Sequence, residues 1–582
     1  MDLLHADRAG VADLTPTHPW WRRAWRLPLA VHVAALAVAL VALVPFVGPG
    51  VSFSADEGAA IVQARHLARG DGWIVDHPVP EADPDGGNYP LELSARGPDG
   101  RTAPFAKHPL YAVLLGAASR LGGVTAMVLL SVAGTVAAAA LAAALAGRMG
   151  RGVARPALWA VGVGSPLLFD GYLVIAHTLG AALAAGAVLC AVRAFDDRRR
   201  WLSSAAGVLA CAAVAVLLRT EATLFALALA ATVAVAAVVR RQLQALAVAA
   251  AALIATAGAS LVEDRWVRHI MGGPSTTTGS FNAIATGLAA RLKGFRLTWL
   301  MPSYTGSRAH DLALLAMIGL LAAAAIIARR RPDDGPRITL LAGTAAAASI
   351  AALVTGPDTL VPGLVLTLPL AAGVLLVRRH QLGSPATLIT AGTFALFALG
   401  VLATQYPQGG SGEWGGRYFA LGLPLLVPLA LAALASHRRQ VDGATARTAA
   451  AALVVCTAAV SVMAVASLRS SHRFTSELMA RIERGGEQVG ERPVLVTTAP
   501  AVPRLAWQTF DRQRWLLADE DDEDDLVDLV GRLRRAGVGR FGLVTNQLPR
   551  DQALVEQTGA RIVGRDGRPD GGDWQVLVVD AG

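Results

Sequence analysis

Long apolar stretches dominate this chain of 582 residues and decide what it can fold into. Runs of about 20 apolar residues, enough to cross about 30 Å of hydrocarbon as a helix, recur from about residue 28 to about residue 468. Only 16% of the residues are charged, against roughly 25% in soluble proteins. The chain is therefore predicted to be an α-helical multi-pass membrane protein, which leaves transporters, channels and membrane-embedded enzymes as candidate classes.

The apolar runs are bounded by charges, proline or glycine, and these boundaries predict about thirteen transmembrane helices. We expect them at 28–47, 123–147, 156–170, 174–195, 202–218, 221–239, 243–262, 310–328, 337–355, 359–377, 386–404, 418–436 and 448–468. All cysteines (Cys190, Cys211 and Cys456) fall within these runs, so neither a disulfide framework nor a zinc ribbon is expected.

Arginine placement predicts the sidedness of the spans, because short cytoplasmic loops retain Lys and Arg. Arginine clusters precede the first span, follow the second and mark every second connection thereafter, near residues 22–26, 148–155, 198–200, 240–241, 329–331, 378–379 and 438–439. We therefore expect a cytoplasmic segment 1–27, a transmembrane domain 28–468 in the plasma membrane, and an extracytoplasmic domain 469–582. The net charge of +9 is explained by this topology, so no nucleic-acid partner is expected.

Three connections predicted to lie outside are long, at 48–122, 263–309 and 405–417, and they carry the unusual polar residues. Beyond residue 468 the composition becomes that of a soluble protein. Short β-rich runs at Val494–Thr497, Phe541–Thr545 and Val576–Val579 alternate with helical patterns, which predicts a small α/β domain.

Asp56 and Glu57 follow the first span by a few residues. Two adjacent carboxylates at the membrane rim must face water, or hold a cation or an acceptor hydroxyl, because burying them is costly. The alternative is an N-cap, with Ser54 or Asp56 opening a helix along the interface over residues 59–68.

Two further stretches offer cations on the predicted outer side. Lys107, followed by His108 and Pro109, suits a phosphate group, or is a lysine that reaches to the interface before an ordinary helix start. Arg417, followed by Tyr418, offers a planar fork for a phosphate or carboxylate, or is an interfacial anchor.

Four other ionisable residues lie near the predicted outer ends of spans. Asp170 and His177 flank a turn and could line an acceptor or phosphate pocket, although a turn residue need not be buried. Arg219 and Glu221 lie between the fifth and sixth spans, where they could join the same pocket, pair with each other or reach the surface.

The order and sidedness of these motifs resemble the GT-C superfamily of polyprenyl-phosphate-sugar glycosyltransferases. An Asp-Glu pair after the first span, the Lys107–Tyr111 stretch, the Trp414–Tyr418 stretch, about thirteen spans and an outer C-terminal domain are all similar to that superfamily. The likeness is greatest to the branch of protein O-mannosyltransferases and the lipid A aminoarabinose transferase.

The resemblance implies an inverting transfer of a sugar from a lipid phosphate to a cell-envelope glycan, glycolipid or protein on the outer face. It implies Asp56 as the general base, with Glu57 either orienting it or acting as a cap. Lys107, Arg417 and Tyr418 would bind the lipid phosphate, with membrane lipids around the site. His108, Asp170, His177, Arg219 and Glu221 would be candidates for the pocket.

Some relatives bind a divalent cation near the Asp-Glu pair, but this sequence shows no compact ligand cluster, so the metal stays open. The main alternative function is a lipid or glycan flippase or transporter, in which the outer loops would act as gates. A scaffold for envelope assembly, with no catalysis, is a third possibility.

Overall fold

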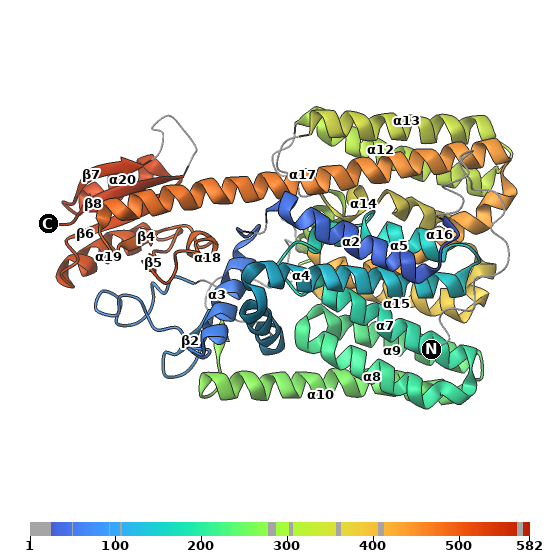
Figure 1. Cartoon of the computed structure of the whole chain (residues 1–582), viewed down its shortest axis with the longest axis horizontal. Coiled ribbons are helices and arrows are strands. Elements are labelled where there is room, and N and C mark those ends of the chain that lie inside the picture. The colour runs from blue at the N-terminus through green and yellow to red at the C-terminus, as the bar shows by residue number, and fades with distance from the viewer. Residues whose placement is uncertain are drawn as a thin grey trace.

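A computed structural model describes residues 25–48, 50–91, 94–104, 108–277, 287–301, 307–356, 362–404, 413–566 and 574–582. Within these ranges, eleven helices are long and apolar enough to cross a membrane. They form one bundle with a small α/β domain at one end (Figure 1). The predicted fold class, a multi-pass helical membrane protein with a small C-terminal sheet domain, is confirmed.

The long helices follow the predicted apolar runs, most within a few residues. They are α2 (Leu29–Val47), α4 (Pro109–Met149), α7 (His177–Asp196), α8 (Trp201–Leu218), α9 (Glu221–Val239), α10 (Leu246–Met271), α12 (Arg308–Arg330), α13 (Gly335–Thr355), α15 (Pro385–Thr404), α16 (Leu423–His437) and α17 (Gly443–Val489).

Two of the thirteen predicted spans are broken into short pieces. The run at 156–170 forms α5 (Ala154–Gly162) and α6 (Leu167–Asp170), and the run at 359–377 contains α14 (Leu364–Thr367) and the 3₁₀ helix η4 (Pro369–Leu376). Pro166 and Pro369 stand at the breaks, where a proline cannot continue a helix because it lacks an N–H and restricts the residue before it. The breaks bring irregular backbone into the bundle at the end where the polar residues gather.

The arginine clusters of alternate connections meet at one end of the bundle. Arg148 pairs with Asp196, Arg240 donates to the carbonyl of Gly383, and Arg329 donates to the carbonyl of Leu375. This shared end lies opposite the α/β domain (Figure 1).

At the other end, segments from the first long loop lie between the bundle and the α/β domain. They are α3 (Ala55–Arg69), the strands β1 (Ala95–Arg96) and β2 (Thr102–Ala103), and the first part of α4 before a kink at Gly122–Gly123. β1 pairs antiparallel with β2 and also with β3 (Thr276–Thr277), so the first two long loops are joined.

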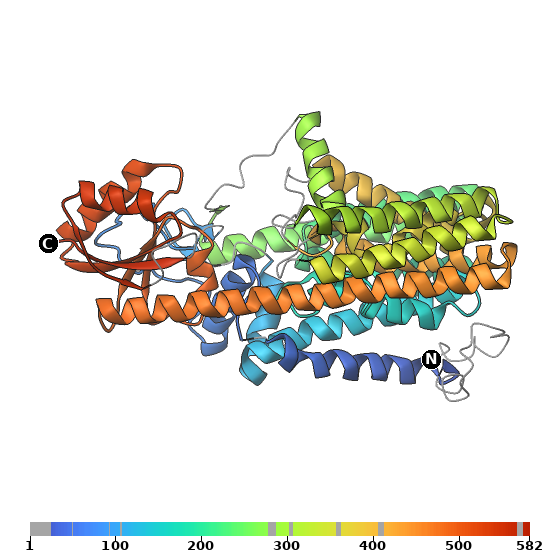
Figure 2. The same ribbon diagram turned by 90° about the horizontal axis from the view of Figure 1, so that it is seen from above.

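Helix α17 does not end at the membrane but continues into the α/β domain (Figure 2). There it packs on one face of a five-stranded sheet of order β5-β4-β6-β8-β7, made of β4 (Val494–Thr497), β5 (Arg514–Leu517), β6 (Arg540–Thr545), β7 (Arg561–Asp566) and β8 (Gln575–Asp580). Helices α19 (Glu523–Arg535) and α20 (Leu548–Gln557) supply the core on the opposite side, together with Val79 and Ala82 from the first long loop.

Candidate functional site

Asp56 lies in the first turn of α3, at the end of the bundle that faces the α/β domain (Figure 1). The side chain of Ser54 caps this helix by accepting from the Glu57 N–H, so the N-cap alternative describes the backbone here. The Asp56 carboxylate meets two guanidinium groups, with Oδ2 3.1 Å from Nη1 of Arg417 and Oδ1 3.5 Å from Nη1 of Arg504. The cap sets the helix start, and Asp56 is left to make tertiary contacts.

Glu57 points away from these arginines and is 1% exposed. Its carboxylate accepts backbone N–H groups from Phe53 at 2.8 Å, Ser54 at 2.9 Å and Val174 at 2.7 Å. Burial raises the pKa of Glu57 to about 7, although the backbone hydrogen bonds oppose the shift. Glu57 thus ties the start of α3 to the segment between α6 and α7.

The loop that carries Arg417 is held by close packing. Gly415 and Gly416 have φ of 77° and 71°, a region that favours glycine, and a Cβ on Gly415 would lie 2.3 Å from Cγ of Pro166. The buried Trp414 ring stacks on Phe169 with centroids 5.8 Å apart. The backbone therefore approaches Pro166 closely at Gly415, and this packing fixes the direction of Arg417.

Arg417 joins two acids. Its Nη1 lies 3.0 Å from Oε1 of Glu413 as well as 3.1 Å from Asp56, and its Cζ lies 5.3 Å from the centroid of the Tyr418 ring. Burial raises the pKa of Glu413, while the charge of Arg417 opposes that shift.

Asp170 and His177 join the same network through Glu413. His177 Nδ1 lies 3.5 Å from Oδ1 of Asp170 and 3.6 Å from Oε2 of Glu413, and all three side chains are buried. The sequence predicted that Asp170 and His177 could line an acceptor or phosphate pocket, and the structure places them next to Glu413, which pairs with Arg417. Glu413, which the sequence interpretation left out of the candidate site, is the group that connects them.

Arg219 and Glu221 form a buried ion pair, with Nε to Oε2 at 3.1 Å and Nη2 to Oε1 at 3.0 Å. This is the pairing that the sequence left open, and the positive charge of Arg219 still acts on Glu413. His108 lies apart, with Nδ1 2.7 Å from Oε1 of Glu263 and Nε2 3.2 Å from Oγ1 of Thr220. Lys107 falls outside the described residues.

Arg504 is a site residue that the sequence interpretation missed. It lies in α18 (Val502–Leu505) of the C-terminal domain, in a segment without any recognisable motif, and its side chain is buried. Helix α3 approaches this segment so closely that a Cβ on Gly58 would lie 1.8 Å from the carbonyl oxygen of Arg504. Only contact between the domain and the membrane region makes Arg504 a neighbour of Asp56.

The arrangement combines one partly exposed carboxylate with guanidinium groups on two sides. Such a carboxylate can accept a proton, and the guanidinium groups can bind an anionic oxygen. Among the residues that the structure describes, no group of three or more His, Cys, Asp or Glu side chains is placed to hold a metal ion.

No protein-family model matches the chain, and no curated protein matches it. Among solved structures, it is similar to two crystal structures of ArnT from Cupriavidus metallidurans. The form bound to undecaprenyl phosphate is 15% identical, with 94% of this chain and 98% of that chain covered and a TM-score of 0.43. The apo form is 16% identical, with 94% and 97% covered and a TM-score of 0.44.

Proposed function

We propose that this membrane protein is a glycosyltransferase that moves a sugar from a polyprenyl-phosphate donor to a cell-envelope glycan, glycolipid or protein. The observation that carries the proposal is the 3.1 Å contact between Asp56 and Arg417, two residues from separate motifs that resemble those of such transferases. The contact lies at the end of the bundle that we place outside the plasma membrane, with the N-terminus in the cytoplasm.

The chemistry explains why one acid and several cations suffice. When a hydroxyl attacks the anomeric carbon, the leaving group is a phosphate, which is a weak base and needs no protonation by a general acid. A base for the hydroxyl proton and cations for the departing charge are the remaining needs. Asp56 would take the proton with inversion at the sugar carbon, and Arg417 and Lys107 would bind the phosphate.

The ion pairs that Arg417 forms with Asp56 and Glu413 are consistent with this mechanism. Arg417 offers Asp56 a positive partner at 3.1 Å, and an ionised carboxylate is the form that accepts a proton. A lipid phosphate would compete with Asp56 and Glu413 for the same guanidinium. Donor binding would therefore loosen Asp56 at the moment when it is needed as the base.

The experiment is reconstitution of the full chain in liposomes with a panel of synthetic polyprenyl-phosphate sugars, both hexosyl and pentosyl, and an envelope extract as acceptor. We expect one donor to release polyprenyl phosphate and to form a new glycosidic bond in step with it. Movement of a lipid-linked sugar across sealed vesicles without a new bond would instead establish the flippase or transporter.

A further inference from the structure

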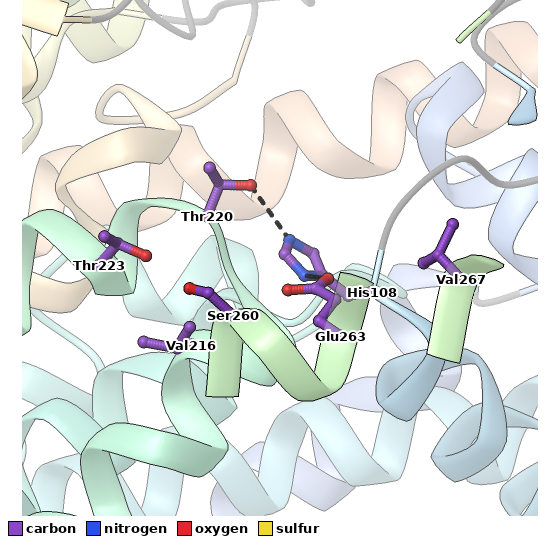
Figure 3. A pocket seen from close by; sticks show the side chains of 7 residues that line it. All are labelled: His108, Val216, Thr220, Thr223, Ser260, Glu263 and Val267. Atoms are coloured by element: carbon purple, nitrogen blue, oxygen red, sulfur yellow. Dashed lines mark hydrogen bonds and ion pairs between the residues drawn. The ribbon is translucent and has the colours of Figure 1, made fainter. Parts of the chain in front are cut away.

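A small polar pocket opens at the same end of the bundle, between the start of α4, the turn from α8 to α9, and α10 (Figure 3). Its volume is about 230 Å³, and it is lined by His108, Val216, Thr220, Thr223, Ser260, Glu263 and Val267. This is below the roughly 300–1,000 Å³ of pockets for drug-sized ligands, so the pocket suits one small unit.

Two hydroxyl groups in the pocket are available to a ligand. Serine and threonine in apolar helices commonly donate to the carbonyl four residues earlier, as Thr232 and Thr256 do here at 2.8 and 2.9 Å. Thr223 and Ser260 make no such side-chain bond within the described part of the chain. Their hydroxyls lie on facing sides of the pocket (Figure 3).

His108 and Glu263 add a polar wall to the pocket, to one side of these two hydroxyls (Figure 3). The His108 ring is held at both nitrogens, by Glu263 at 2.7 Å and by Thr220 at 3.2 Å. Its backbone has φ of 34°, a strained region for a residue other than glycine, and such strain tends to occur at ligand-binding positions. Since the carboxylate of Glu263 repels an anion, the pocket favours a neutral ligand with several hydroxyl groups.

The pocket adjoins the proposed catalytic network through one turn of chain. Thr220 faces the pocket, while its neighbours Arg219 and Glu221 form the buried ion pair whose arginine acts on Glu413. A sugar ring bound beside Thr220 would therefore lie one residue along the chain from the buried Arg219–Glu221 ion pair.

We propose that this pocket is a subsite for a single monosaccharide unit of a substrate, with Thr223 and Ser260 as its specificity-determining hydroxyls. The inference rests on the proposed function and adds a binding site to it. The unit would belong either to the lipid-linked donor or to the acceptor, since both present the same ring hydroxyls.

The test is binding of methyl glycosides of hexoses and pentoses to the full chain in detergent, by saturation-transfer NMR, with glycerol and inorganic phosphate as comparison probes. We expect at least one methyl glycoside to bind more tightly than either probe. The double variant Thr223→Val/Ser260→Ala should weaken that binding about tenfold or more, because two hydrogen bonds are lost. Thr256→Val, one turn earlier on α10, is the matched control and should bind as wild type.

Equal binding by the double variant, or preference for glycerol or phosphate, would overturn the proposal. Asp56→Asn should retain glycoside binding, so the subsite can be established even if no sugar transfer is found. Where transfer is found, a raised KM of the double variant for the lipid donor assigns the ring to the donor, and a raised KM for the acceptor assigns it to the acceptor. Transfer that is unchanged in the double variant would refute the subsite while leaving the proposed function intact.

Discussion

Asp56 and Arg417, separated by 361 positions in the sequence, meet with Oδ2 3.1 Å from Nη1, and the same nitrogen lies 3.0 Å from Oε1 of Glu413. One guanidinium nitrogen thus donates to two carboxylates, one in the first turn of α3 and one four residues before Arg417. An anion that binds Arg417 through this nitrogen would compete with both carboxylates, and under the proposed function the binding of a lipid phosphate there would be linked to the contacts of Asp56.

Replacement of Asp56 by asparagine should lower sugar transfer by about 10²–10⁴-fold, because asparagine cannot accept the proton of the acceptor hydroxyl. Transfer from the active donor of the panel measures this, with membrane insertion checked by yield and gel filtration. Asp71→Asn is the matched control, since Asp71 follows α3 and pairs with exposed Arg69. Wild-type activity of Asp56→Asn would eliminate Asp56 as the base.

Arg417→Met should abolish transfer and also destabilise the protein by about 3–5 kcal/mol, because Glu413 would be left buried without its cation. The double variant Arg417→Met/Glu413→Gln should recover most of that stability in thermal unfolding while activity stays absent. If the double variant also regained activity, Arg417 would be a structural partner of Glu413 and not a phosphate ligand.

Glu57 should make stability depend on pH in the direction opposite to most carboxylates. Burial raises its pKa from the unfolded value of 4.5 to about 7, so the folded chain holds the proton more tightly than the unfolded chain. The stabilising contribution is complete below about pH 4.5 and is lost as the pH rises through about 7, by up to about 3 kcal/mol.

Thermal unfolding of wild type and Glu57→Gln between pH 5 and 8 measures this contribution. The stability advantage of wild type over the variant should shrink as the pH rises, because only wild type can lose the proton. Glu556→Gln, at an exposed position on α20, is the control, and its thermal stability should change with pH as that of wild type does. A constant difference between wild type and Glu57→Gln would show that Glu57 keeps one protonation state throughout.

The membrane region could be predicted from sequence because hydropathy alone selects helices of spanning length. The interruptions at Pro166 and Pro369 were not predicted, because the apolar runs continue through them and only the short helices that result reveal the break. For Arg417, the sequence predicted only the chemical class of its partner, a phosphate or a carboxylate. That Glu413 connects it to His177 depends on a loop fixed by the stacking of Trp414 on Phe169.

The role of Arg504 could not be predicted from sequence motifs. Its contact with Asp56 depends on how a separately patterned domain packs on α3, and the sequence around residues 502–505 carries no sign of that packing. For Glu57, only the local contact could be predicted. The sequence offered Ser54 as a helix cap, but the hydrogen bond from the Val174 N–H to the Glu57 carboxylate joins segments that are distant in sequence, so no local pattern indicates it.

Arg504→Gln should lower transfer by about tenfold, because Asp56 loses one of the two charged hydrogen-bond donors found among the described residues. Arg65→Gln is the matched control, since Arg65 also joins α3 to the C-terminal domain, through the carbonyl of Trp507 at 3.0 Å, without touching Asp56 in any contact that we describe. Both variants weaken docking of the domain, but only Arg504→Gln should change the rate strongly. Equal losses in the two variants would assign Arg504 to docking alone.

The proposed orientation predicts which end of the bundle a membrane-impermeant maleimide reaches in intact cells. Glu556→Cys on α20 should be labelled, whereas His380→Cys, at the end where the arginines gather, should be labelled only after permeabilisation. Both positions are exposed, so accessibility within the protein does not separate them. The native Cys190, Cys211 and Cys456 are replaced by alanine to remove background labelling. Labelling of residue 380 but not 556 in intact cells would place the Asp56 site in the cytoplasm and exclude transfer at the outer face.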